Sequence, residues 1–173
     1  IYTTLTLLLT LASYGEQHRK GKYSITDKAI PRPYYEGVHQ RWPGSEDKIP
    51  DGERIPIMTI KDKTFHEVTW DIVVPESYDP NIPTGIITYI TPGSGKAFIN
   101  LLSKYNLILI TAKNSGNDTY TYARISMALW GIDKLKEIYN IDADRIFVSG
   151  MSGGGRVSSI AAALFPEIYK GAI

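Results

Sequence analysis

The chain of 173 residues contains no cysteine, which excludes disulfides, thiolate metal sites and a cysteine nucleophile together. It also lacks a charge imbalance, since 19 Lys and Arg stand against 18 Asp and Glu, spread along the sequence. Without a basic or acidic stripe, neither a nucleic acid nor a strongly acidic partner is expected. No apolar run is long enough to cross a bilayer, so no stable membrane anchor is expected either.

The first fifteen residues, IYTTLTLLLTLASYG, carry no charge. The segment Leu5–Ala12 is apolar except for threonines, the small residues Ser13 and Gly15 follow it, and polar sequence begins directly afterwards. This order is typical of the end of a secretion signal, here without an initiator Met or a basic n-region. We therefore expect residues 1–15 to be a partial signal peptide and the protein to be secreted. An apolar first strand or helix of the mature fold is the alternative.

Residues 16–63 are rich in Pro, Gly and charged residues and keep neither helical nor strand periodicity for long. This composition predicts a loop-rich N-terminal extension that runs over the surface. Its aromatic residues Tyr34, Tyr35 and Trp42 either pin the extension to the body of the domain or line a binding groove. We favour the first interpretation.

From residue 64 to residue 173 the patterns indicate regular structure. Residues 68–74 alternate apolar and polar, as in a strand with one wet face, whereas residues 86–90 and 107–112 are apolar on both faces, as in central parallel strands. Between Asp118 and Asn140 apolar residues recur at helical spacing, which predicts an amphipathic helix with Asp118 or Thr119 as N-cap.

The remaining residues continue this alternation of strand and helix. Residues 145–149 (RIFVS) predict a short strand, and the spacing after Gly153 predicts a helix that ends at Pro166. Residues 170–173 then open another strand. The order of elements predicts one α/β domain with a mainly parallel sheet flanked by helices.

The sharpest chemical signal is Gly150-Met151-Ser152-Gly153-Gly154, a G-x-S-x-G sequence between the strand RIFVS and the following helix. A nucleophilic serine in this setting sits on a tight strand-to-helix turn that leaves its hydroxyl exposed. Glycines flank it because side chains there would collide with neighbouring backbone. The alternative is a glycine-rich turn in which the serine has no chemical role.

The segment DRIFVSGMSGGGRVSSIAAALFPEIYKGAI resembles the nucleophile-elbow region of α/β-hydrolases, most of all the secreted esterase and polyhydroxybutyrate-depolymerase-like branch. The positions that match are Asp144, Arg145, Ser152, Gly153, Gly154, Pro166 and Tyr169. The resemblance covers residues 64–173 and implies the N-terminal part of an α/β-hydrolase domain. It also implies a carboxylic-ester hydrolase that acts on a small or polymeric ester through an acyl-enzyme on Ser152, without a metal or cofactor.

A second feature of the resemblance is Thr91-Pro92-Gly93, which stands where the family usually has the His-Gly that starts its oxyanion loop. The family pattern implies backbone N–H donors at Gly153 and at Ser94 or its neighbour Gly93. This chain lacks that His, and a plain Pro-Gly turn is the alternative. Residues 114–118, after the strand 107–112, either line the cleft or, as we favour, supply turn chemistry and a helix cap.

The sequence Gly95-Lys96 resembles the end of a phosphate-binding loop, but the pattern fails on both sides. It requires Gly where Ile90 stands and Ser or Thr where Ala97 stands. Nucleotide binding is therefore not expected.

In this family the triad acid and then the His follow the nucleophile. The 21 residues after Ser152 include Glu167 but no histidine, and His18, His39 and His66 all precede the elbow. We therefore expect the reading frame to extend beyond both ends, and this chain to lack the triad acid and base. A serine peptidase on the same fold and a non-catalytic binding protein remain alternatives.

Overall fold

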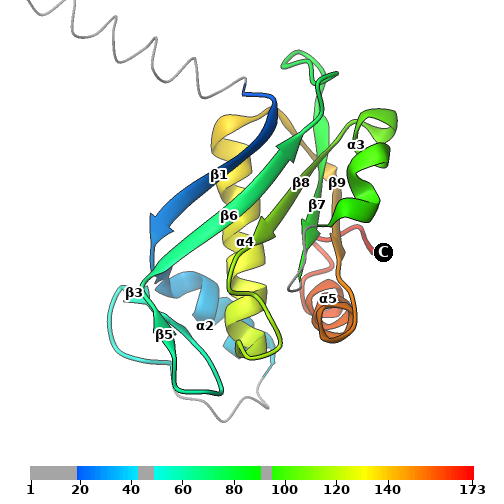
Figure 1. Cartoon of the computed structure of the whole chain (residues 1–173). Coiled ribbons are helices and arrows are strands. Elements are labelled where there is room, and N and C mark those ends of the chain that lie inside the picture. The colour runs from blue at the N-terminus through cyan, green and yellow to red at the C-terminus, as the bar shows by residue number, and fades with distance from the viewer. Residues whose placement is uncertain (1–18, 43–48, 91–94) are drawn as a thin grey trace, which may run out of the picture.

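A six-stranded sheet of order β1-β6-β8-β7-β9-β10 organises the chain in this computed structural model, which describes residues 19–42, 49–90 and 95–173 (Figure 1). The strands of the sheet are β1 (Gly21–Lys28), β6 (Glu67–Val74), β7 (Thr84–Tyr89), β8 (Leu107–Ala112), β9 (Ile141–Ser149) and β10 (Gly171–Ala172). The helices are α2 (Arg32–Arg41), η1 (Lys96–Phe98), α3 (Ile99–Tyr105), α4 (Thr121–Ile138) and α5 (Gly153–Leu164). Two short pairs lie outside the sheet: β2 (Ile30–Pro31) with β3 (Arg54–Ile55), and β4 (Ile57–Met58) with β5 (Thr64–Phe65).

The four strands β8, β7, β9 and β10 run parallel, while β6 and β1 extend the β8 side in antiparallel pairs. This confirms the predicted α/β class with a mainly parallel sheet. Every residue of β8 is buried, as is every residue of β7 except Tyr89. Strands buried on both faces must be apolar on both faces, which is why the sequence marked these two as central.

Helices cover the two faces of the sheet unequally. On one face, side chains of β7 and β8 such as Ile86 and Ile110 join a large core with α2, α4 and α5. On the other face, Ile87 and Leu109 form a smaller core with Leu102 of α3. Because successive side chains of a strand point to opposite faces of the sheet, β7 and β8 each contribute side chains to both cores. None of the described helices is both long and apolar enough to cross a membrane.

The predicted loop-rich extension is wrong for much of residues 19–42. Strand β1 pairs with β6 over all eight of its residues, and α2 packs on α4 with Tyr35 and Val38 fully buried. The sequence pattern did not predict β1, because only two of its inward-facing side chains, Tyr23 and Ile25, are apolar. Both are half-buried. A strand at the sheet edge needs no more than this.

The aromatic residues of the extension do pin it to the domain. The Tyr35 ring lies 5.4 Å from that of Tyr122, and the Tyr34 hydroxyl donates a 2.8 Å hydrogen bond to Asp133. Trp42 is half-buried at the end of α2. The expected signal segment 1–15 lies outside the described residues.

Two expectations about α4 were wrong. The helix begins at Thr121 after Tyr120 as N-cap, with no side-chain cap, because Asp118 pairs with Lys61 and the Thr119 hydroxyl donates to the Asn114 carbonyl. The helix is also not simply amphipathic, since every residue from Tyr122 to Ile132 is buried. It lies between the sheet and α2, so its first three turns have no solvent-exposed face.

Trp70 of β6 anchors α4 to the sheet. Its indole Nε1 donates a 3.0 Å hydrogen bond to the Met127 carbonyl, and its ring meets Trp130 edge-on at 4.8 Å. A Cβ on Gly131 would lie 2.9 Å from Nε1 of Trp70 and 3.0 Å from Cδ1 of Ile110. Gly131 is therefore the residue that lets α4 approach the sheet so closely.

We expect Gly131→Ala to lower the free energy of unfolding by about 1–3 kcal/mol, because the added methyl group overpacks a rigid core. The matched control is Gly37→Ala in α2, where an added Cβ meets nothing within 4 Å. That change is expected to be neutral or to stabilise by up to about 1 kcal/mol, through helix propensity. Urea unfolding of both variants makes the comparison, and equal effects would contradict the packing argument.

Candidate active site

Ser152 occupies the turn between β9 and α5, and its backbone has φ 55° and ψ −122°. A positive φ is costly for a serine, and such strain concentrates at functional sites. The residue is exposed, it is the N-cap of α5, and its hydroxyl makes no capping hydrogen bond. The hydroxyl is therefore presented to solvent instead of being used to cap the helix.

Close backbone contacts hold this turn in place. A Cβ on Gly150 would collide with the Ile90 carbonyl oxygen and would lie 2.5 Å from the carbonyl carbon of Gly154. The Gly154 N–H donates to the Met151 carbonyl at 2.8 Å, and the Arg156 N–H donates to the Ser152 carbonyl at 3.2 Å. Only glycine fits at position 150, as the G-x-S-x-G spacing predicted.

Asn117, in the loop after β8, lies against the residue that follows the serine. A Cβ on Gly153 would collide with Oδ1 of Asn117, and the Cγ of Asn117 would be 2.9 Å away. The sequence placed residues 114–118 at the carboxyl edge of the sheet but favoured turn chemistry over a cleft position. The structure brings Asn117 to the elbow, and this contact has no signal in the sequence.

The loop that carries Asn117 is built by its own hydrogen bonds. Ser115 donates to the Ala112 carbonyl at 2.7 Å, Thr119 Oγ1 donates to the Asn114 carbonyl at 2.5 Å, and the Thr119 N–H donates to the Gly116 carbonyl at 3.0 Å. Asn114 has a positive φ of 58°. This confirms the expected turn chemistry, and it fixes the loop beside the elbow.

Of the predicted oxyanion donors, Gly153 is the first residue of α5, directly after Ser152. The other two, Gly93 and Ser94, lie outside the described residues, as do Thr91 and Pro92. The start of α5 places the Gly153 N–H and the positive end of the helix dipole at the elbow. A developing negative charge would be favoured there.

The two described histidines are not bonded to the serine. His66 is exposed just before β6, and three strand spacings separate β6 from β9, which amounts to about 14 Å. The His39 ring packs 5.2 Å from the Tyr122 ring. Within residues 19–42, 49–90 and 95–173 no hydrogen bond joins Ser152 Oγ to a histidine. His18 lies outside these residues.

Glu167, the carboxylate that follows Ser152, lies beyond the far end of α5, about 18 Å along the helix from the elbow. A hydrogen bond from its own backbone and contact with Arg41 lower the pKa of Glu167. It is therefore tied to α2 and not to the elbow.

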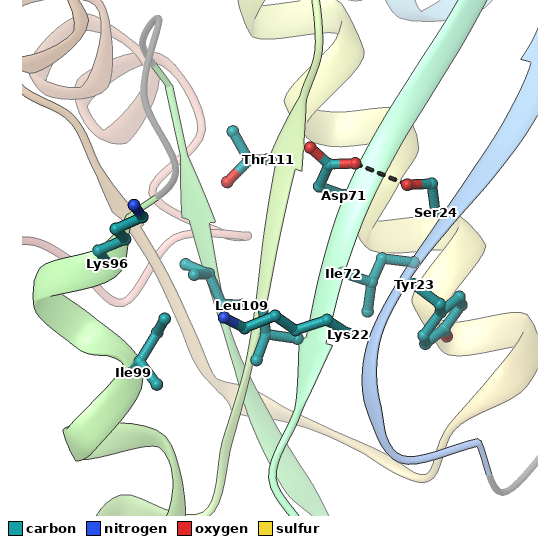
Figure 2. Close-up of a pocket in the computed structure, with 10 residues that line it drawn as sticks. Lys22, Tyr23, Ser24, Asp71, Ile72, Lys96, Ile99, Leu109 and Thr111 are labelled. Carbon is teal, nitrogen blue, oxygen red and sulfur yellow. Dashed lines mark hydrogen bonds between the residues drawn. The ribbon is translucent and has the colours of Figure 1, made fainter.

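A cavity of about 270 Å³ lies on the α3 side of the sheet, away from the elbow (Figure 2). Leu109 and Val73 are among its lining residues, and Lys22 and Lys96 reach toward it from β1 and η1. Ser24 donates a 2.6 Å hydrogen bond to Asp71 there. None of its lining residues belongs to the turn that carries Ser152.

Comparison with solved structures gives the class of fold. A protein assigned as a dipeptidyl aminopeptidase IV from Bacteroides ovatus matches with a TM-score of 0.52 and 20% identity, over 68% of this chain and 20% of its own. A thermostable esterase matches with a TM-score of 0.51 and 18% identity, over 68% of this chain and 38% of its own. No family model matches the chain, and no curated protein sequence matches it.

These likenesses show that the chain has the fold of the α/β-hydrolases, as the resemblance implied. The chain spans less than two fifths of the length of either structure.

We expect two glycines of the elbow, Gly150 and Gly153, to respond differently to alanine. Gly150→Ala should cost at least about 3 kcal/mol of stability or prevent folding, because its Cβ meets backbone atoms that cannot move aside. Gly153→Ala should cost about 1 kcal/mol, because its Cβ meets only the Asn117 side chain.

A double-mutant cycle tests the second contact. In an Asn117→Ala background, Gly153→Ala should cost nothing measurable, which corresponds to a coupling energy of about 1 kcal/mol. Thermal or urea unfolding of the four proteins measures it. Additive effects would show that Asn117 does not rest on Gly153.

Proposed function

We propose that this chain carries the nucleophile of a serine hydrolase, a secreted carboxylic-ester hydrolase, with Ser152 as that nucleophile. The observation that carries the proposal is the backbone of Ser152, held at φ 55° between a strand and a helix with its hydroxyl exposed. A strained serine has little value for stability. It has clear value for presenting an oxygen to a carbonyl carbon.

The proposed reaction is acyl transfer in two steps. The Ser152 oxygen bonds to the ester carbonyl carbon as its proton passes to a base, and the carbonyl oxygen becomes an oxyanion. Collapse of this intermediate breaks the bond to the alcohol oxygen, which takes up the proton and leaves. Water then attacks the acyl-enzyme by the same steps, and the acid and free Ser152 are restored.

The oxyanion requires fixed donors close to Ser152. We assign one to the Gly153 N–H at the start of α5, and a second to Ser94 or Gly93 after β7, as the family resemblance implies. Asn117 rests against Gly153, and its loop is held by its own hydrogen bonds. This support would keep the Gly153 N–H in one orientation throughout the reaction.

The proposal also requires a general base for the Ser152 hydroxyl. His66 precedes β6, which lies three strand spacings, or about 14 Å, across the sheet from β9, and residues 153–173 contain no histidine. We therefore assign the base and its acidic partner to residues other than His66 and residues 153–173. Without a base, a serine hydroxyl is a weak nucleophile at neutral pH.

Ester hydrolysis and peptide hydrolysis share this elbow. The esterase assignment is supported by the sequence resemblance around Ser152, and a peptidase is the second candidate because one structural neighbour is named as an aminopeptidase. Secretion, which we infer from residues 1–15, favours substrates outside the cell membrane.

We expect the protein expressed from its complete gene to be labelled by a fluorophosphonate probe, and Ser152→Ala to abolish labelling. The matched control is Ser159→Ala, because the Ser159 hydroxyl is exposed on the same helix but donates to the Gly155 carbonyl at 3.0 Å. That variant should label like the wild type. Gel fluorescence measures both, and labelling that survives Ser152→Ala would overturn the choice of nucleophile.

A further inference from the structure

Arg124, in the first turn of α4, is a buried cation that the proposed chemistry does not use. Its side chain is only 3% exposed. Its Nε and Nη2 atoms have no hydrogen-bond partner, and no ion pair joins it to an acidic residue in the part of the chain that the structure describes. A guanidinium stays protonated at neutral pH, so this is a buried charge with no ion-pair partner among the described residues.

Such a group calls for a partner, because buried charges in proteins are paired and hydrogen-bonded. Burial, together with a smaller effect of Arg156, lowers the pKa of Arg124, in the direction expected when an anion is missing beside it. Arg156 is exposed and bonded to Thr121 at 3.4 Å, so it adds positive charge to the same region.

Arg124 lines a cavity of about 10 Å³. This volume holds about one water-sized atom. Three residues with hydroxyls also line the cavity. Thr88 donates its proton to the Phe147 carbonyl, Ser115 donates to the Ala112 carbonyl, and the ring of Tyr89 packs against Phe98. The Nε and Nη2 groups of Arg124 donate to no acceptor among the described residues, so a guest that pairs with them must present an acceptor oxygen.

The cavity adjoins the elbow. Ile90, at the carboxyl end of β7, is one of its walls, and the carbonyl oxygen of Ile90 is the atom that a Cβ on Gly150 would strike. Ala112 and Ser115, at the carboxyl end of β8, form another wall. Ligands of open α/β sheets enter at this edge, which also carries Ser152.

We propose that this cavity takes one oxygen of a carboxylate carried by the acyl substrate, and that Arg124 is the residue that selects such acidic esters. The substrate part of this proposal rests on the proposed function of Ser152. The binding part does not, because it concerns only Arg124 and the cavity.

The binding part is tested by thermal unfolding in acetate at constant ionic strength, with acetamide as the uncharged control of the same shape. Acetate should raise the Tm of the wild type saturably, by about 3 °C, and acetamide should not. Arg124→Met should lose this response without a lower starting Tm, because it removes an unpaired buried charge. Arg156→Met removes the same charge from an exposed site and should keep the response.

The substrate part is tested by hydrolysis of mono-p-nitrophenyl glutarate and of its methyl ester, which differ only in the carboxylate. Arg124→Met should lower kcat/KM for the charged ester at least about tenfold, the size of effect typical of a charged recognition contact, and change that for the methyl ester less than twofold. Arg124→Gln serves as a second variant should the methionine protein fail to fold. Ser152→Ala should abolish turnover of both esters but keep the acetate response.

The outcomes separate the two parts. The proposed binding site is wrong if acetate does not raise the Tm of the wild type. It is also wrong if acetate still raises the Tm of Arg124→Met. An acetate response combined with equal losses on both esters would overturn selection of the substrate by Arg124. Turnover that survives Ser152→Ala would overturn the proposed nucleophile while leaving the binding result intact.

Discussion

The structure depends on the close approach of β7 and β9 at their carboxyl ends. There the Ile90 carbonyl lies so near Gly150 that no side chain can be placed between them. The chain must therefore turn sharply after β9, and α5 must start within a few residues. Ser152 takes the strained position in that turn, so the geometry of the site follows from the packing of two buried strands and not from contacts of the serine itself.

Rigid packing on the face of the sheet that carries the large core allows the strained backbone of Ser152 to persist. Trp70 joins β6 to α4 by a hydrogen bond and an edge-on ring contact, and Gly131 lets the helix lie close against it. The N-terminal residues add to this side through β1 and α2, which belong to the domain instead of running over it. Strain of about 1–3 kcal/mol at one residue persists only where the surroundings leave it no alternative.

Two arginines place positive charge at the same edge, and neither forms an ion pair within the part of the chain that the structure describes. The first turns of α4 and α5 carry Arg124 and Arg156, and the dipole of each helix adds to their field at its N-terminus. One of these arginines is buried and the other is exposed, so they serve different purposes. The exposed one shapes the potential around the elbow, whereas the buried one needs a partner inside the protein or on a ligand.

The sequence by itself determined the central strands, the helix after Gly153 and the position of the candidate nucleophile. These features are local, because two-sided burial and a glycine-bracketed turn leave their mark within a few residues. Tertiary structure alone decided the places of β1 and α2, the start of α4, the contact of Asn117 with Gly153 and the burial of Arg124. Each of these joins residues far apart in the chain, and a polar side chain reads the same in a sequence whether it is solvated, packed on a glycine or buried beneath a sheet edge.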